Sequence, residues 1–170
     1  VDRTVHTAEH LASAMFHLGV PIQEIPRAKL AAERNAPLQP YAIFHPVASQ
    51  ADKTWPAERF VTVARHMRKE WGIEPVFIAA SGEDLTPFVE FQAYVGAPLG
   101  RVKTLIANAS LFAGNDSGPA HMAAAFGLPA VVVFGSSNAE IWRPWQTPSA
   151  VLQSENGIEA VTTAEMLSAL

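Results

Sequence analysis

The chain has 170 residues, of which 49% are apolar and 16% are charged. This length and composition predict one folded domain with a sizeable core and exclude a disordered chain. The net charge of −4 gives no support for a nucleic-acid-binding surface, and the absence of cysteine excludes disulfides and thiolate metal sites.

Residues 1–40 differ from the rest of the chain, and we expect them to form a helix and a connecting arm. Apolar residues recur at helical spacing from Thr7 to Leu18, and Gly19 and Pro21 end this pattern. Further prolines bracket a short alanine-rich run, which favours an extended segment. We expect this segment to pack on the following domain or to come from a neighbouring one.

A His-x-x-Glu-His pattern, typical of one metallopeptidase group, lies at His6, Glu9 and His10. Histidines four residues apart share a helix face. However, so short a motif recurs by chance, and the sequence offers no evident third ligand. A polar face on a surface helix is therefore the favoured interpretation, and we predict no metal site.

From residue 41 onward, short apolar runs alternate with amphipathic stretches. We predict strands at 41–47, 74–79, 110–113, 130–134 and 150–153, and helices at 57–71, 85–94, 104–109, 118–126 and 163–170. This alternation predicts an α/β fold with a doubly wound parallel sheet and helices on both faces.

A polar turn, from Asn115 to His121, follows the third predicted strand, at the sheet edge where parallel α/β proteins bind ligands. Asp116 or Ser117 could cap the next helix, and Gly118 lets a ligand approach the backbone closely. Free amides at a helix N-terminus bind anions. We predict a phosphate-binding turn, because an ordinary capped turn gives no reason for Asp116 and His121.

A hydrolytic role for this turn is disfavoured. Ser117 lies on a strand–turn–helix, as a nucleophilic serine can, and His121 follows four residues later. However, the Gly-x-Ser-x-Gly pattern is absent. A base one turn further along the same helix is also badly placed to activate that hydroxyl.

Other polar groups follow the predicted strands at the same edge. Lys53 is either a solvated lysine or a point charge for a phosphate. Glu83 and Asp84 either accept hydrogen bonds from ribose hydroxyls or are loop acids without a partner. A second polar turn lies at 135–138, and the tryptophans after it form either a wall against a base or a small satellite core.

Three sequence blocks together resemble the C-terminal half of glycosyltransferase family 9, the ADP-heptose:lipopolysaccharide heptosyltransferases. The first block combines residues 45–49 with the Lys-Thr-Trp-Pro of 53–56. The second and most specific, residues 114–129, is similar to the family's Asp-Ser/Thr-Gly-x-x-His-x-Ala-Ala signature. The third is the Val-Phe-Gly-Ser-Ser of 133–137. Their order and spacing agree with the family over about residues 41–170.

This resemblance implies the C-terminal half of a GT-B fold, in which two Rossmann-like domains enclose the active site. Residues 41–170 would be the nucleotide-sugar-binding domain. The implied reaction is an inverting transfer of heptose, or a related sugar, from ADP-heptose or a similar donor, without metal or cofactor. The catalytic base would be an aspartate of an N-terminal domain that we expect to be missing, so this chain alone should be inactive.

The resemblance also implies a set of donor-binding residues. Lys53 would meet the diphosphate, Asp116 would contact the heptose, and Glu83 would hold the ribose. The complete set is Ser49, Lys53, Glu83, Asp116, Ser117, Gly118, Ala120 and His121, with the amides of the last four cradling the diphosphate. The segment 96–101 is shorter than the family's usual strand and loop, so the resemblance does not fix a third strand there.

The expected partners are the nucleotide-sugar donor, the N-terminal acceptor-binding domain and a glycolipid acceptor such as the lipopolysaccharide core. The alternative is a non-catalytic module on the same fold that binds phosphate, a nucleotide or a partner protein. No apolar run approaches the ~20 residues of a membrane span, and no signal peptide opens the chain. We therefore expect a cytoplasmic location, with peripheral attachment at the inner membrane.

Overall fold

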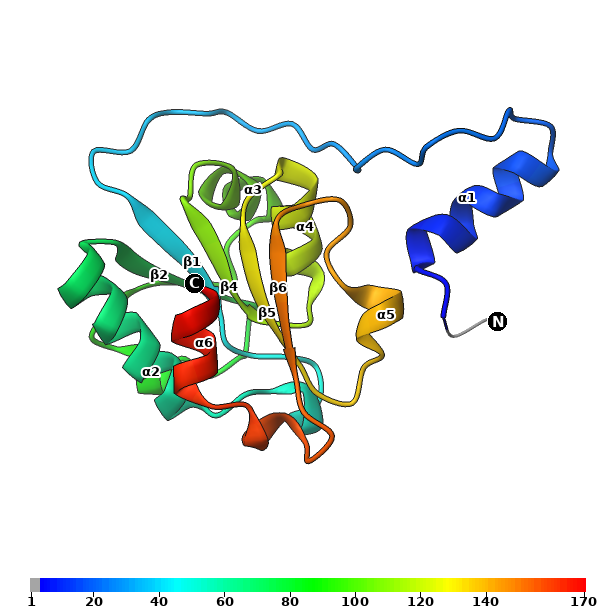
Figure 1. Ribbon diagram of the computed structural model, residues 1–170. Helices are drawn as coiled ribbons and strands as arrows, with labels where there is room; N and C mark the ends of the chain where they lie inside the picture. Colours follow the sequence, from blue (N-terminus) through cyan, green and yellow to red (C-terminus); the bar gives the residue numbers. More distant parts are fainter. Residues whose placement is uncertain (1–3) are drawn as a thin grey trace.

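The computed structural model describes residues 4–170 and contains a six-stranded parallel sheet between two layers of helices (Figure 1). The strand order is β3-β2-β1-β4-β5-β6. The strands are β1 (Tyr41–His45), β2 (Glu74–Ala79), β3 (Gln92–Val95), β4 (Leu111–Asn115), β5 (Ala130–Phe134) and β6 (Ser149–Gln153). This arrangement confirms the predicted doubly wound, Rossmann-like fold.

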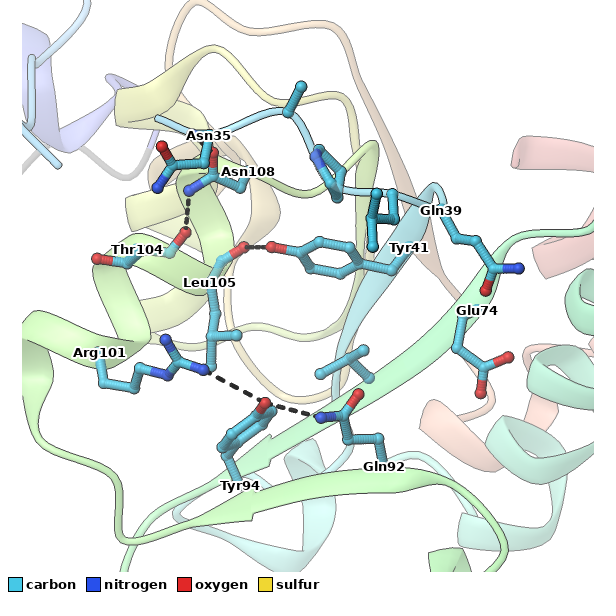
Figure 2. A pocket seen from close by; sticks show the side chains of 14 residues that line it. Asn35, Gln39, Tyr41, Glu74, Gln92, Tyr94, Arg101, Thr104, Leu105 and Asn108 are labelled. Atoms are coloured by element: carbon cyan, nitrogen blue, oxygen red, sulfur yellow. Dashed lines mark hydrogen bonds between the residues drawn. The ribbon is translucent and has the colours of Figure 1, made fainter. Parts of the chain in front are cut away.

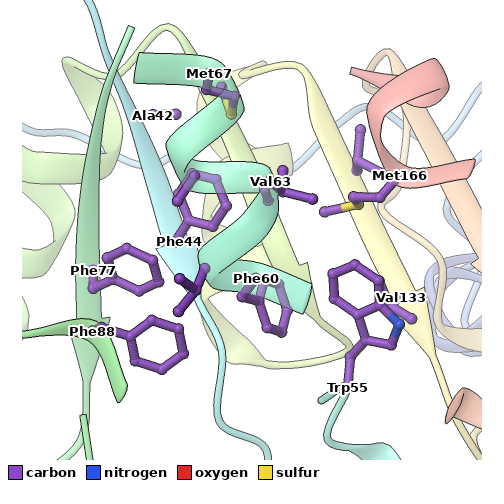
Figure 3. Packing of buried hydrophobic residues seen from close by; sticks show 14 of the residues in the cluster. Ala42, Phe44, Trp55, Phe60, Val63, Met67, Phe77, Phe88, Val133 and Met166 are labelled. Atoms are coloured by element: carbon purple, nitrogen blue, oxygen red, sulfur yellow. The ribbon is translucent and has the colours of Figure 1, made fainter. Parts of the chain in front are cut away.

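Each face of the sheet carries its own apolar core. Helices α2 (Ala57–His66) and α6 (Thr163–Ala169) cover one face, whereas α3 (Leu99–Ala107) and α4 (Gly118–Phe126) cover the other. Figure 3 shows the first core, where the rings of Phe44 and Phe77 stack with centroids 5.0 Å apart. Because both faces are covered, β5 is buried along its whole length, as its unbroken apolar run predicts.

Short elements complete the domain, and two helices end at glycines. Gly72 and Gly127 take left-handed backbone conformations with φ of 66° and 73°. The short elements are η1 (Ala51–Lys53), the π-helical turn η2 (Met67–Trp71), η3 (Thr86–Phe88), α5 (Ala139–Trp142) and η4 (Ile158–Ala160).

The helix predicted at 85–94 is wrong. The chain forms the 3-10 turn η3 there and then the edge strand β3, which pairs in parallel with β2. Phe88 and Phe91 turn inward and pack on Phe77, with ring centroids 4.3 and 5.2 Å away. Pairing with β2 and burial of the two rings therefore outweigh the local helical spacing. The next helix, α3, consequently begins at Leu99 and not at residue 104.

The N-terminal segment consists of α1 (Thr7–His17) and an extended stretch, residues 18–40, which we call the arm. The arm crosses the layer formed by α3 and α4 (Figure 1). It is held there by Arg34, which donates to the carbonyl of Phe126 at 3.3 Å, and by the Asn35 amide, which donates to Asn108 at 2.6 Å. No helix within residues 4–170 combines the length and apolar character needed to cross a bilayer.

Candidate functional site

A cleft of about 600 Å³ lies at the carboxyl ends of β1, β2 and β4. Its volume lies within the ~300–1,000 Å³ range of small-molecule sites. Five of the sequence-predicted donor residues line it: Ser49, Glu83, Asp116, Ser117 and Gly118. Apolar side chains, including Ile78, Leu99, Val102 and Met122, form the remaining wall.

The N-terminus of α4 opens into this cleft. Ser117 occupies the N-cap position, but its side chain makes no capping hydrogen bond, and its Oγ is buried without a partner. A Cβ at Gly118 would meet open space, and within residues 4–170 its amide N–H has no protein acceptor. The amides of Ala120 and His121 instead donate to the Ser117 carbonyl at 3.1 and 3.5 Å. The groups left for a ligand are therefore the Ser117 hydroxyl and the Gly118 amide.

The side chains of Ala120 and His121 point away from the cleft. Ala120 is buried in the core beneath α3 and α4. The His121 ring lies edge-on to Trp142, with centroids 6.5 Å apart. Burial lowers the pKa of His121, while the nearby Asp116 raises it and His6 lowers it further. Asp116 thus lies between the cleft and the His121–Trp142 pair, half-buried beside both.

The structure separates the two acids that follow β2. Glu83 lines the cleft, and one of its carboxylate oxygens accepts from the Ala80 amide at 2.6 Å. This contact fixes the carboxylate at the cleft wall. Asp84 is exposed and accepts from the Thr86 amide at 2.7 Å. Hydrogen bonding to the side chain and to the backbone of Thr86 lowers the pKa of the Asp84 carboxyl. Asp84 therefore belongs to the turn that follows, and Glu83 is the acid of the site.

Lys53 lies in η1, half-buried, and does not line the cleft itself. Its turn is placed by Gly135, because a Cβ at Gly135 would collide with the carbonyl oxygen of Asp52 and approach the Cα of Lys53. The glycine of the 133–137 block thus allows the lysine turn to pack against the end of β5. The sequence shows this glycine only as part of a polar turn, because its packing against residues 52 and 53 depends on the fold.

Asn115 is a second residue that sequence reasoning missed, although it stands inside the most specific motif. It is fully buried at the end of β4. Its amide oxygen accepts from the backbone N–H of Trp55 at 3.0 Å, and its nitrogen donates to the carbonyl of Pro46 at 2.7 Å. Both ends of the loop that carries Ser49 and Lys53 are therefore tied to β4.

His45, the last residue of β1, is the third residue that was missed. Its side chain lines the cleft, and the residue is only 8% exposed. Burial lowers the pKa of the His45 ring, and the charge of Glu83 opposes this shift. The available signal is its position as the polar residue that ends an otherwise apolar strand, in the first of the three blocks.

The two histidines of the His-x-x-Glu-His pattern have different environments. The His6 Nδ1 accepts from the Ala8 amide at 3.1 Å, its Nε2 lies 2.8 Å from the Arg143 carbonyl, and its ring stacks on Trp145. His10 is exposed. Among residues 4–170, no three His, Cys, Asp or Glu side chains gather closely enough to hold a metal ion. His6 caps α1 and attaches it to the loop after α5.

A larger hollow, of about 760 Å³, lies at the opposite end of the sheet, between the arm, α3 and the start of β1, β2 and β3 (Figure 2). Its polar groups largely bind one another or nearby backbone. Tyr41 donates to the Leu105 carbonyl at 2.7 Å, and Gln92 donates to Tyr94 at 2.7 Å. The Glu74 carboxylate is paired with Arg68 at 2.7 Å. The cleft at the carboxyl edge is therefore the better candidate site.

Known proteins resemble this chain in sequence. The sequence profile of glycosyltransferase family 9 (heptosyltransferase) matches residues 1–167, which include the arm as well as the sheet domain. A lipopolysaccharide heptosyltransferase 3 of Escherichia coli is 36% identical over 120 residues, which are 63% of this chain and 34% of that protein. Its counterpart in strain K12 is 30% identical over 117 residues, 62% of this chain and 33% of that protein.

Solved structures share the fold. A glycosyl transferase family 9 protein from Veillonella parvula superposes with a TM-score of 0.85 at 24% identity, covering 99% of this chain and 60% of that chain. The E. coli heptosyltransferase WaaC, solved with ADP, gives a TM-score of 0.69 at 20% identity, covering 79% of this chain and 45% of that one. Compared with the two curated E. coli relatives, the chain spans about a third of their length.

Proposed function

Because the chain belongs to glycosyltransferase family 9, we propose that residues 41–170 form the donor-binding half of a GT-B heptosyltransferase. One observation carries this proposal: the buried Ser117 hydroxyl lacks a partner at the N-terminus of α4, inside a cleft at the carboxyl edge of the sheet. Such an arrangement suits the phosphates of a nucleotide sugar. The family's signature places a serine or threonine at this position.

The donor is ADP-heptose or a similar nucleotide sugar. Ser49, the Ser117 hydroxyl and the Gly118 amide hold its diphosphate within the cleft, and the Lys53 side chain extends to it from η1, outside the cleft lining. Glu83 accepts from the ribose hydroxyls, and Asp116 faces the heptose. Ala120 and His121 act indirectly, because their amides complete the first turn of α4, whose positive end faces the diphosphate.

The chemical step breaks the bond between the anomeric carbon and the diphosphate oxygen, and the ADP that leaves carries the negative charge. Lys53 and the N-terminus of α4 stabilise that charge as it develops, from fixed positions that need no reorganisation. An acceptor hydroxyl attacks from the opposite face of the sugar, so the configuration is inverted. An aspartate of a separate N-terminal domain removes the hydroxyl proton, and none of the site residues of this chain serves as the base.

The acceptor, a glycan of the lipopolysaccharide core or a similar glycolipid, binds mainly to that N-terminal domain, at the cytoplasmic side of the inner membrane. The exposed face of α1 supports the presence of a further domain. Helix α1 has no buried residue. Its Leu11 and Met15 are 65% and 52% exposed, and Leu18, which follows the helix, is 77% exposed. A second domain would cover such an apolar face.

Titration calorimetry of the 170-residue chain with ADP and with UDP tests the donor site. We expect millimolar or tighter binding of ADP, weakened about tenfold by Lys53→Ala and less by Ser117→Ala. The diphosphate is charged in both contacts, but only the lysine donor adds a positive charge of its own. Lys69→Ala is the matched control, because that side chain is 82% exposed and pairs with Glu70.

The donor-site proposal fails if neither nucleotide binds at millimolar concentration and Lys53→Ala behaves as the unchanged chain does. Mixing the chain with the N-terminal half of a close relative then separates the enzyme from a non-catalytic module. Heptose transfer that depends on both halves supports the enzyme. Nucleotide binding without transfer in any such mixture favours the non-catalytic module.

A further inference from the structure

The His45 ring is a buried polar group that the fold does not use. Its Nδ1 is buried without a hydrogen-bond partner, and within residues 4–170 no group hydrogen-bonds either ring nitrogen. His6, which is buried to a similar extent, has both nitrogens engaged. Nδ1 is enclosed by the protein, whereas Nε2 is not among the buried unpaired atoms, so Nε2 is the ring nitrogen that remains for a ligand in the cleft.

The position of His45 indicates which part of a ligand this nitrogen would meet. Strand β1 lies between β2 and β4, and His45 pairs with Gly114 at the end of β4. A Cβ at Gly114 would lie 2.7 Å from the His45 carbonyl oxygen. The absence of a side chain at Gly114 therefore lets β1 and β4 pack closely beneath the cleft. Glu83 stands on the β2 side of the ring, and Ser117 with Gly118 on the β4 side.

The ring acts as a neutral hydrogen-bonding group. Burial lowers its pKa, against the opposing charge of Glu83, so the imidazole carries one N–H donor and one bare nitrogen at neutral pH. A buried N–H without an acceptor is rarer in proteins than an unsatisfied acceptor. The favoured tautomer therefore leaves the buried Nδ1 bare and places the proton on Nε2, which can donate to a ligand in the cleft.

We propose that His45 is a donor-binding residue whose Nε2–H donates to the α-phosphate of the nucleoside diphosphate. This inference rests on the proposed function, which puts the ribose beside Glu83 and the diphosphate beside Ser117 and Gly118. The α-phosphate is the group that joins ribose to the terminal phosphate. It would therefore lie over β1, between these two walls, where the His45 ring forms the floor.

Three substitutions distinguish the ring nitrogens. The amide nitrogen of His45→Gln reaches about as far as Nε2, that of His45→Asn reaches about as far as Nδ1, and His45→Leu has neither. We expect His45→Leu and His45→Asn to weaken ADP and AMP binding about fivefold, which is the effect of one hydrogen bond, and His45→Gln to retain it. Adenosine, which has no phosphate, should bind all four proteins alike. His17→Gln, an exposed histidine at the end of α1, is the control.

Each result has a separate meaning. If the unchanged chain does not bind ADP, the proposed function fails together with this inference. If ADP binds the unchanged chain and all three variants equally, only the His45 assignment is overturned. If His45→Asn retains ADP binding and His45→Gln loses it, the Nε2 contact is overturned. If the variants lose as much affinity for adenosine as for ADP, the α-phosphate is overturned as the partner of the ring.

A measurement on the unsubstituted protein guards against misfolded variants. With ¹⁵N-labelled histidine, AMP should shift the His45 Nε2 resonance and leave that of His17 unchanged. Adenosine should leave both in place. A His45 spectrum that does not respond to saturating AMP contradicts the proposal, whatever the variants do.

Discussion

The side chain of Asn115 accepts a hydrogen bond from the backbone amide of Trp55 at 3.0 Å, across sixty residues of sequence. The same side chain donates to the Pro46 carbonyl at 2.7 Å. Trp55 is itself fully buried, and its indole nitrogen donates to the Val161 carbonyl at 2.8 Å. The loop that presents Ser49 and Lys53 is therefore held at both ends against strand β4, next to Asp116 and Ser117.

Asn115→Ala should destabilise the protein and loosen this loop. The substitution leaves one buried N–H and one buried carbonyl without partners, which costs about 2 kcal/mol or more of unfolding free energy. Urea denaturation measures the loss, and hydrogen exchange should show faster exchange of the Trp55 amide. Asn156→Ala, on an exposed turn, should change neither quantity. Equal effects of the two substitutions would contradict the assigned role of Asn115.

Gly135→Ala should disturb the lysine turn through packing alone. The added methyl group would meet the Asp52 carbonyl and the Lys53 Cα, both of which are backbone and cannot rotate away. We expect the free energy of unfolding to fall by about 1–3 kcal/mol, the usual cost of overpacking. ADP binding should also weaken, because Lys53 is displaced.

Gly100→Ala is the matched control for this glycine. Gly100 lies in α3, and a Cβ there would meet open space. Alanine is a better helix former than glycine, so this substitution should raise the free energy of unfolding by about 0.5–1 kcal/mol. The two substitutions should therefore change the free energy of unfolding in opposite directions. Stabilisation by Gly135→Ala would show that the turn does not pack as described.

The sequence predicts the fold well because alternation of strands and helices is a local pattern. The sequence-based prediction of a helix fails at 85–94. Phe88 and Phe91 have helical spacing there, but their burial against Phe77 decides the conformation. The same limit applies to the site. The polar turn at Asp116 and Ser117 is visible locally, whereas the roles of Asn115, Gly135 and His45 depend on contacts between distant segments.

His6→Ala should detach α1 from the domain, whereas His10→Ala should not. The His6 ring caps α1 through the Ala8 amide, and it also contacts the Arg143 carbonyl and Trp145. Loss of an N-cap costs about 1 kcal/mol. Limited trypsin digestion should therefore cut the arm at Arg27 or Lys29 sooner in His6→Ala. Equal acceleration by His10→Ala would mean that the two histidines act as a pair, as in a metal site.

Stability should fall as the pH decreases below the ordinary histidine pKa. Burial lowers the pKa of His45, where Glu83 opposes the shift, and of His121, where Asp116 opposes it and His6 adds to it. The unfolded chain therefore binds protons more readily than the folded one. The free energy of unfolding should be greatest above about pH 6.5 and decline toward about pH 5, where the carboxylates are still mostly charged.

Urea midpoints measured across that range test this linkage. His45→Gln and His121→Gln should each flatten the dependence, and the double variant should flatten it most, because neither glutamine titrates. His17→Gln, at an exposed position, should retain the full slope. A slope unchanged in the double variant would assign the acid sensitivity to other groups. It would also remove the argument that burial keeps the His45 ring neutral in the donor cleft.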